Sequence, residues 1–391
     1  MSLLSLLIIP TILSSAVEED FFPILIWDNI PENHDQVQEI ADCGITVVYS
    51  PTHRLDLAHE YGLKAIVNDN RSSSYYFRDI NAEKALENVK TLTEEVGSHP
   101  ALLGYYLRDE PHADLFPGLA LVSKAFLSND PDKIPLINLF PNYASSRQLG
   151  TETYKEHVDK YIQTVDPAVI CYDHYALMEY EPLREGYFAN LETIRNAALK
   201  YKKPFWNVVL ANAHFTYREP TAADMRFQVF TTLAYGGKGI GYFTYVARDR
   251  GNYRMSPIDQ FGNRTATWYY MQNVNLMVHK LAPTLLKLTS TGVYHTGDIP
   301  EGCENLPGDT LIKSISGNTD FLIGEFKHSD GSDYVMIVNK SFQNSTPFRL
   351  EFNKSDVRLQ RVSPYTGEIH NLSAENDWLA PGQGVLLKLA E

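Results

Sequence analysis

The chain has 391 residues, which is enough for one domain of roughly 250 residues and one of roughly 100. Apolar residues make up 44% and charged residues 21% of the sequence, as in ordinary globular proteins, so a disordered chain is excluded. The formal net charge is −14, which argues against nucleic-acid backbones and anionic membrane surfaces as partners. An anionic polysaccharide would need a local basic patch, and no run of Lys or Arg supplies one.

The N-terminus begins with an apolar stretch, Leu3–Leu13, followed by Ser14, Ser15 and Ala16. The stretch is shorter than the roughly 20 residues that cross a bilayer, and the small residues after it fit a signal-peptidase site. We therefore expect residues 1–16 to be a signal peptide, the mature protein to be secreted or periplasmic, and no stable membrane insertion. The alternative is a buried N-terminal segment, because no Lys or Arg precedes the apolar run.

From Phe21 to about Val246, short apolar runs alternate with amphipathic helical segments. The predicted strands are Pro23–Asp28, Ile45–Ser50, Lys64–Asp69, Leu102–Arg108, Ile134–Phe140, Ala168–Tyr172, Phe205–Leu210 and Ile240–Tyr245. The predicted helices include Ala82–Val96, Pro117–Ser128, Tyr154–Thr164, Asn190–Tyr201, Ala222–Ala234 and Trp268–Leu285. Such alternation predicts a parallel sheet with right-handed crossovers. Eight units fit a closed (β/α)8 barrel over residues 17–288 better than an open doubly wound sheet, because no GxGxxG follows the first strand.

Beyond Pro283 the helical periodicity stops and short strands recur between turn residues. The predicted strands are Gly292–His295, Thr310–Ser316, Phe321–Lys327, Asp333–Asn339, Phe348–Phe352, Arg358–Ser363 and Gly384–Leu389. Short strands separated by turns predict an antiparallel β-sandwich, here over residues 289–391. We expect the functional pocket to lie on the barrel alone, because barrels of this kind carry their chemistry at the C-terminal ends of the strands.

The sharpest motif is Arg108-Asp109-Glu110-Pro111 at the end of the fourth predicted strand. Adjacent carboxylates repel, so one of them should keep its proton to higher pH, as a general acid must. Pro111 then ends the strand ladder. The alternative is the start of a helix, where acids favour the first turn and Pro suits it. The position at a strand end favours the chemical role.

The segment Gly104–Pro111 resembles the fourth strand of barrel glycosidases, in which an acidic or amide residue precedes the acid/base Glu. The segments Ile137–Tyr143 and Ala234–Ile240 resemble those of bacterial glycoside hydrolases, some of them galactosidase-like. The resemblance covers the barrel, from about Phe21 to Leu285. It implies a glycosidase that cleaves a bond in an oligosaccharide or polysaccharide, with Glu110 as general acid/base.

One departure concerns the second carboxylate. Retaining enzymes of the large cellulase–galactosidase clan place a nucleophilic Glu at the end of strand seven, whereas Phe205–His214 contains no acid. Glu219 follows, but it lies beyond the strand and is better suited to opening the next helix.

Two mechanisms remain open. In the first, Asp173 on strand six acts as nucleophile or as the base that activates water. In the second, Asp109 polarises a substrate N-acetyl group, as in the chitinases and hexosaminidases, which resemble this chain in a strand-four acid pair and a Tyr-Asp such as Tyr172-Asp173. Strand alternation would point Asp109 away from the face of Glu110 unless a bulge intervenes. We therefore favour Asp173.

Other polar and aromatic residues near the strand ends are candidates for sugar binding, since sugars need hydrogen-bonding groups and flat rings. Asp28 and Asp69 are expected to hold hydroxyls or brace Arg108, and Arg108 to bind a carboxylate or hydroxyl or to tune Glu110. The further candidates are Trp27, Tyr106, Asn138, Tyr172, His174, Tyr175, Trp206, His214 and Tyr245. For each of them a purely structural role is the alternative.

Other chemistries have little support in the sequence. The 12 His residues are scattered without HExxH or comparable spacing, so we expect neither a catalytic metal nor a cofactor. The glycine-rich segment Gly236–Gly241 lacks the Lys-Ser/Thr of a phosphate loop and precedes a strand, and no GxSxG elbow occurs. The rival hypothesis is a non-catalytic carbohydrate-binding barrel that has lost its strand-seven nucleophile.

Overall fold

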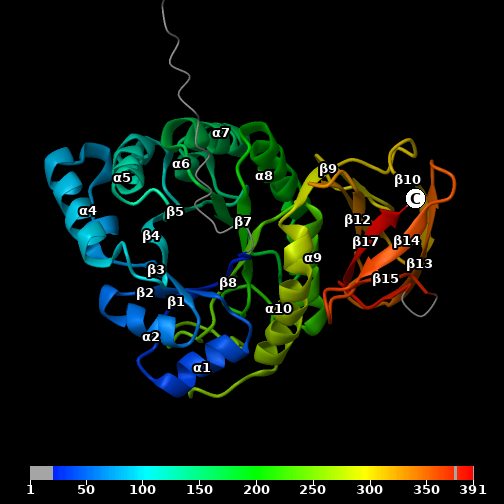
Figure 1. The fold of residues 1–391 in the computed structure, drawn as a ribbon, viewed down its shortest axis with the longest axis horizontal. Coiled ribbons are helices and arrows are strands. Elements are labelled where there is room, and N and C mark those ends of the chain that lie inside the picture. Colours follow the sequence, from blue (N-terminus) through cyan, green and yellow to red (C-terminus); the bar gives the residue numbers. More distant parts are fainter. Residues whose placement is uncertain (1–20, 374–376, 391) are drawn as a thin grey trace, which may run out of the picture.

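The computed structural model describes residues 21–373 and 377–390, and the expected signal peptide lies outside these ranges. Two bodies stand side by side, a barrel surrounded by helices and a smaller all-β body (Figure 1). The predicted fold class, a TIM barrel followed by an antiparallel β-sandwich, is confirmed.

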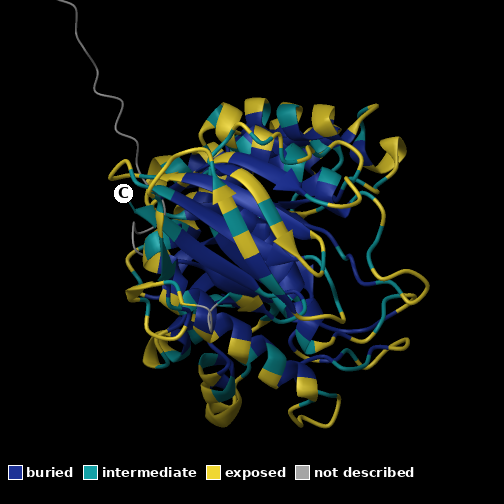
Figure 2. Cartoon of the chain, turned by 90° about the vertical axis from the view of Figure 1, so that its right-hand side faces the viewer, coloured by how far each residue is buried: buried dark blue, intermediate teal, exposed yellow. Residues whose placement is uncertain are grey.

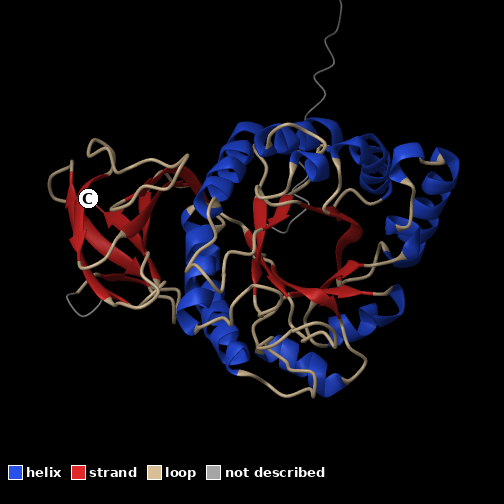
Figure 3. Cartoon of the chain, turned by 180° about the vertical axis from the view of Figure 1, so that it is seen from behind, coloured by secondary structure: helices blue, strands red, loops and turns tan. Residues whose placement is uncertain are grey.

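Eight parallel strands close the barrel in chain order, as Figure 3 shows in the ring of strands inside the ring of helices. The strands are β1 (Ile24–Asn29), β2 (Val47–Ser50), β3 (Lys64–Val67), β4 (Leu102–Asp109), β5 (Ile134–Leu139), β6 (Ile170–Asp173), β7 (Phe205–Leu210) and β8 (Gly239–Phe243). Each of the eight predicted strands corresponds to one of them. The side chains that point inward from these strands fill the barrel with a separate apolar cluster that includes Leu25, Ile66, Leu136 and Val208. The barrel is therefore a packed core, with room for chemistry only at its end.

The helices around the barrel bury one face each against the strands. They are α1 (His34–Asp42), α2 (Leu55–Glu60), α3 (Asn70–Ser73), α4 (Ala82–Val96), α5 (Phe116–Asn129), α6 (Ser146–Leu149), α7 (Tyr154–Val165), α8 (Tyr187–Tyr201), α9 (Ala222–Ala234) and α10 (Ala266–Leu285), with short 3-10 turns η1 (Thr52–Arg54), η2 (Phe77–Asp79) and η3 (Ala113–Leu115). Helix α4 is typical: Asn81 caps its N-terminus by accepting from the Lys84 amide at 3.0 Å. Its buried residues recur at helical spacing, from Ala85 to Val96.

The C-terminal body consists of a six-stranded and a three-stranded antiparallel sheet. Its strands are β9 (Leu288–His295), β10 (Ile312–Gly317), β11 (Phe321–His328), β12 (Asp333–Asn339), β13 (Thr346–Phe352), β14 (Arg358–Val362), β15 (Ile369–Asn371), β16 (Trp378–Leu379) and β17 (Gly384–Ala390). The order is β15-β14-β17-β12-β11-β9 in the larger sheet and β10-β13-β16 in the smaller. Ile323, Val335 and Leu387 of the larger sheet pack against Phe348 of the smaller one to form a second core. In Figure 2 the buried interior of this body lies behind strands whose outer residues are exposed.

Helix α9 lies between the two bodies and is buried on all sides. Of its 13 residues, only Ala222 and Arg226 are not buried. Strands β11, β12 and β17 pack against it. A Cβ on Gly324 would lie 2.2 Å from the carbonyl oxygen of Ala234, so a glycine is needed for this close approach. The polar residues on α9 are satisfied internally: Gln228, for example, bonds both the amide and the carbonyl of Leu210 at 3.1 Å.

Candidate active site

The carboxyl ends of the barrel strands gather acidic and amide side chains at one rim. Asp28 lies in β1, Asp109 ends β4 and Glu110 follows it, Asn138 lies in β5 and Asp173 ends β6. Because all these strands are parallel in one closed barrel, these side chains meet at the same mouth.

Strand β4 carries one extra residue near its end. Tyr106 pairs with Leu136 of β5, but Arg108 pairs with the next residue, Ile137, so Leu107 is the bulged residue. The ring of Tyr106 faces the barrel interior, where it lies 5.5 Å from the ring of Tyr49. With regular alternation Asp109, three residues on, would face outward; the bulge turns it inward. This is the bend that an inward-facing Asp109 requires.

Asn138 joins two of the carboxyl groups. Its Nδ2 donates to Asp109 Oδ1 at 3.0 Å and to Asp173 Oδ1 at 2.8 Å, while its Oδ1 accepts from the Cys171 thiol at 3.4 Å. One amide on β5 therefore fixes carboxyl groups from both neighbouring strands. Together with Glu110, these groups form a cluster of three acids, which we call the acid cluster (Asp109, Glu110 and Asp173).

The members of the acid cluster differ in their exposure. Asp173 is buried, at 2% exposure, and burial, followed by the charges of Glu110 and Asp109, raises its pKa well above the usual range. Asp109 is more exposed and lies at the barrel mouth. Loss of contact with water raises its pKa, but the hydrogen bond from Asn138 and then the guanidinium groups of Arg108 and Arg248 oppose this rise. The protonated form is therefore favoured more strongly at Asp173, which is fully enclosed, than at Asp109, whose rise in pKa is opposed by Asn138 and the two guanidinium groups.

Glu110 has the properties of a proton donor. Partial burial, reinforced by the charge of Asp109, raises its pKa to about 7. Its backbone adopts φ 42°, in the left-handed region that non-glycine residues seldom occupy and that often occurs at functional sites. Its amide donates to the carbonyl of Asn138 at 2.8 Å, which holds this turn against β5. The side chain lines a hollow of about 370 Å³ together with Tyr75, Tyr76, Phe77, Arg78, Arg108, His112, Leu115 and Phe140; we call it the Glu110 hollow.

A second, smaller hollow of about 210 Å³ surrounds Asp28. The Asp28 carboxylate accepts from the amide of Tyr245 at 2.6 Å, and burial raises its pKa to about 7 although this hydrogen bond and Arg248 act against the rise. The Arg248 guanidinium lies over the Phe243 ring, 4.8 Å from its centroid. Trp27, Asn29, Tyr49, Asn68, Tyr106 and Arg248 complete the wall. Rings and hydrogen-bonding groups of this kind suit a sugar.

Two tyrosines lie close to the acid cluster. Burial and then the charge of Asp173 raise the pKa values of Tyr143 and Tyr175. The Tyr175 ring stacks on Phe243 with centroids 5.1 Å apart. The sequence indicated Tyr175, but it indicated neither Tyr143 nor Arg248 as a site residue. Tyr143 ends the segment Ile137–Tyr143 that resembles glycoside hydrolases, whereas the sequence signal for Arg248 was its place in the loop that follows β8.

Several predicted binding residues do not line either hollow. The Trp206 ring lies inside the barrel near the start of β7, where a Cβ on Gly239 would touch it, so it is far down the strand from the mouth. Tyr172 and Tyr245 face the outer core. His174 and His214 are buried beside Asn190 and Asn212, with Nδ1 bonded to these amides at 3.0 and 2.8 Å. For Tyr172 and His174 the physical reason is alternation about Asp173, which sends every second residue away from the barrel axis, whereas Trp206 faces the axis but lies at the wrong end of its strand.

Asp69 has a local partner rather than Arg108. It caps α3 by accepting from the Arg71 amide at 2.8 Å, and it forms an ion pair with the Arg71 side chain at 2.9 Å. The hydrogen bonds from Arg71 lower its pKa. Asp69 therefore holds the start of α3. Glu219 is likewise paired, with Arg254 at 3.0 Å, and lies outside the acid cluster.

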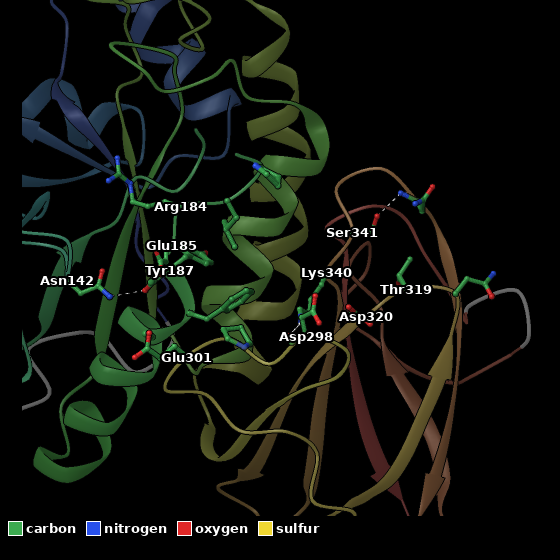
Figure 4. A pocket seen from close by; sticks show the side chains of 18 residues that line it. Asn142, Arg184, Glu185, Tyr187, Asp298, Glu301, Thr319, Asp320, Lys340 and Ser341 are labelled. Atoms are coloured by element: carbon green, nitrogen blue, oxygen red, sulfur yellow. Dashed lines mark hydrogen bonds between the residues drawn. The ribbon is translucent and has the colours of Figure 1, made fainter. Parts of the chain in front are cut away.

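A cavity larger than either hollow is separate from the acid cluster. It has a volume of about 1020 Å³ and is lined by residues of both bodies. In Figure 4, Arg184, Glu185 and Tyr187 lie on the barrel side, facing Lys340 and Asp320 of the sandwich. Lys340 is fixed there, because its Nζ donates to the carbonyls of Thr296 and Asp298 at 3.1 Å.

The described residues include neither a cluster of metal ligands nor a membrane-spanning helix. Across residues 21–373 and 377–390, no group of three or more His, Cys, Asp or Glu side chains is arranged to hold a metal ion. No helix in these same ranges combines the length and apolar character needed to cross a membrane.

No protein-family model and no curated protein matches the sequence. Among solved structures, a glycoside hydrolase family 5 protein from Bacteroides vulgatus has a TM-score of 0.59 at 11% identity, over 95% of this chain and 89% of that one. A second structure, described only as a glycoside hydrolase, has a TM-score of 0.58 at 10% identity, over 95% and 93%. A β-galactosidase from the psychrophilic Marinomonas ef1 has a TM-score of 0.53 at 11% identity, over 68% of this chain and 62% of that one, so this chain spans less than two thirds of that enzyme. At such identities the likeness shows that the chain shares their fold.

Proposed function

We propose that this protein hydrolyses glycosidic bonds, with Glu110 as general acid. The observation that carries the proposal is a glutamic acid with a pKa near 7, beside an open hollow and within the acid cluster. An acid whose pKa lies near the working pH can be protonated before the reaction and deprotonated during it. The fold, shared with proteins described as glycoside hydrolases and a β-galactosidase, is consistent with this activity.

In the proposed step, Glu110 transfers its proton to the glycosidic oxygen as the bond to the anomeric carbon breaks. The electron pair stays on the leaving oxygen, which departs as an alcohol. Positive charge develops at the anomeric carbon, and an oxygen nucleophile must complete the substitution. Water then supplies the new hydroxyl, and Glu110 recovers a proton.

We assign the second carboxylate to Asp109 rather than Asp173. The sequence favoured Asp173 because regular alternation would turn Asp109 away, and the bulge at Leu107 removes that objection. Asp173 is buried and favours its protonated form, whereas a nucleophile, a base or a partner for a developing cation must be ionised. Asp173 then acts through Asn138, whose amide it shares with Asp109. Asp109 either contacts the anomeric carbon directly or orients a 2-acetamido group that does so.

The experiment is a screen of nitrophenyl glycosides followed by single variants. Glu110→Gln should lower turnover about 100-fold or more, because general acid catalysis contributes roughly 10²–10⁴-fold, and activated leaving groups should lose less. Equal losses on activated and unactivated substrates would remove Glu110 from the acid role.

The same substrates locate the second carboxylate. Asp109→Asn should abolish most of the turnover, and Asp173→Asn should cost less because a neutral amide can replace a protonated carboxyl. The reverse order would assign the role to Asp173. Strong inhibition by a thiazoline mimic would support the 2-acetamido route, and rescue of Asp109→Ala by azide, with formation of a glycosyl azide, would support direct attack.

A second candidate function, carbohydrate binding without catalysis, rests on the end of β7. Ala211, Asn212, Ala213 and His214 follow this strand, all are buried, and none carries a carboxylate. Saccharide binding without hydrolysis of any glycoside in the screen would support this candidate.

A further inference from the structure

The Glu110 hollow contains an arginine, Arg108, that forms no ion pair with a carboxylate among the described residues. Arg108 is exposed and lines the hollow, and it forms no hydrogen bond or ion pair within the part of the chain that the structure describes. Its guanidinium does lower the pKa of Asp109, but that carboxylate faces the barrel interior and bonds Asn138. Arg108 lies on the outer side because the bulge places both Leu107 and Arg108 there.

The hollow as a whole has an excess of positive charge. Its ionisable groups are Arg78, Arg108, His112 and Glu110, with the phenols of Tyr75 and Tyr76. Arg78 is paired with Asp114, which lies outside the lining and also contacts the ring of His112. Glu110 is largely uncharged below its pKa of about 7. In a chain with a net charge of −14, this positive region needs a specific explanation.

The sequence contains no run of basic residues that would predict this region, because its basic side chains come from separate elements. Arg78 lies in η2, Arg108 in β4 and His112 in the turn before η3. The absence of a basic run in the sequence therefore does not exclude an anionic sugar as a ligand of the folded chain.

The remaining lining suits a sugar ring. Tyr76 is 70% exposed, and Phe140 and the half-buried Tyr75 lie in the same wall. Aromatic faces bind the apolar faces of pyranose rings, and the volume of about 370 Å³ lies within the range of small-molecule pockets.

Arg248 at the Asp28 hollow has neighbours that Arg108 lacks. Both guanidinium groups lower the pKa of Asp109, but Arg248 also lowers that of Asp28 and lies over the rings of Phe243 and Tyr253, at 4.8 and 5.8 Å. An added anion would therefore gain more at Arg108.

We infer that the Glu110 hollow binds an acidic sugar on the leaving-group side of the scissile bond, with the sugar carboxylate paired to Arg108. The inference rests on the proposed function, because Glu110 as proton donor defines that side. A planar carboxylate matches the guanidinium fork and can accept two parallel hydrogen bonds. The substrate is then a uronic-acid-containing oligosaccharide or polysaccharide.

Binding is tested first in the Glu110→Gln variant, so that no turnover is needed. Glucuronate, galacturonate and mannuronate are compared with glucose, galactose and mannose by NMR titration. At least one uronate should bind about 10- to 100-fold more tightly than its neutral counterpart, as expected for hydrogen bonds between charged groups. Adding Arg108→Gln should abolish this preference. Arg349→Gln, the same change at an exposed site in the sandwich, should leave it intact. Equal binding of acidic and neutral sugars, or a preference that survives Arg108→Gln, overturns the inference.

Turnover then separates this inference from the proposed function. Glycosides with a 3-carboxyphenyl leaving group are compared with the 3-carbamoylphenyl analogues, and the carboxylate should be preferred about tenfold in kcat/KM, chiefly through KM. The ratio should fall toward one in Arg108→Gln and in 0.5 M salt. Hydrolysis without this preference refutes the acidic-sugar inference alone. Arg108-dependent uronate binding without any hydrolysis refutes the proposed function but still supports an anion-binding site at Arg108.

Discussion

Replacing Glu110 by glutamine should stabilise the folded protein at alkaline pH, even though it removes the proposed acid. In the folded state the pKa of Glu110 is about 7, against 4.5 for an unperturbed side chain. Between these two pH values the folded state holds a proton that the unfolded state has released. The free energy of unfolding therefore falls as the pH rises through this window, and the loss is complete above about pH 7.

The size of this effect follows from the shift. A difference of about 2.5 pKa units at about 1.4 kcal/mol per unit gives at most about 3.5 kcal/mol, and contact with solvent reduces this to about 1–2 kcal/mol. Glutamine has nearly the same shape and no charge to bury. The variant should match the parent at pH 4.5 and exceed it by this amount at pH 8, which corresponds to a rise of a few degrees in Tm.

The assay is urea and thermal unfolding of both proteins at pH 4.5 and pH 8. The matched control is Glu87→Gln on the exposed face of α4, where the same chemical change should have a similar, small effect at both pH values. If Glu110→Gln gave equal shifts at pH 4.5 and pH 8, or a lower Tm at pH 8, the desolvation of Glu110 argued here would be refuted.

Four further predictions address the site and the joint between the two bodies. The kcat/KM for unactivated substrates should fall above about pH 7 because Glu110, with a pKa of about 7, loses the proton it must donate; a profile flat to pH 9 would contradict this. Asn138→Leu removes the amide that donates to two carboxyl groups. Because each such hydrogen bond is worth about 1.5–3 kcal/mol, kcat/KM should fall at least tenfold in steady-state assays. Unchanged kinetics would refute the positioning role of Asn138. Lys238→Met should lower the free energy of unfolding by about 2–3 kcal/mol in urea, because three carbonyls at the end of α10 and the start of β9 lose their half-buried donor; no change would show that water replaces it. Gly324→Ala should lower the Tm by several degrees, since its new Cβ would lie 2.2 Å from the Ala234 carbonyl oxygen, and an unaltered Tm would mean that β11 shifts away from α9 without cost.

The fold could be predicted from the sequence because it depends on features that the pattern of apolar residues records. Each barrel strand is a short apolar run, and one such as Phe205–Leu210 is buried on both faces, as a parallel strand between helices and core must be. The shortest strands of the sandwich, β15 and β16, were not predicted, because three and two residues are too few for a periodic signal.

The site could be predicted only as a set of strand-end residues. Which of them face the mouth depends on register, and a one-residue bulge such as Leu107 leaves no mark in the apolar pattern. The same limitation explains Tyr172, which is adjacent to Asp173 yet points into the outer core. Partners supplied by loops, such as Arg248, become visible only when the chain is folded, because their sequence distance from the acids is large.

The burial of α9 has a practical consequence for handling the protein. Its barrel-facing side and its sandwich-facing side are both apolar, with Phe227 and Phe230 among the buried residues. A chain cut after α10 would expose the second of these sides to water, and a contiguous apolar surface of this kind promotes aggregation. We therefore expect limited proteolysis to leave the two bodies associated, and a gene shortened to the barrel alone to yield insoluble material.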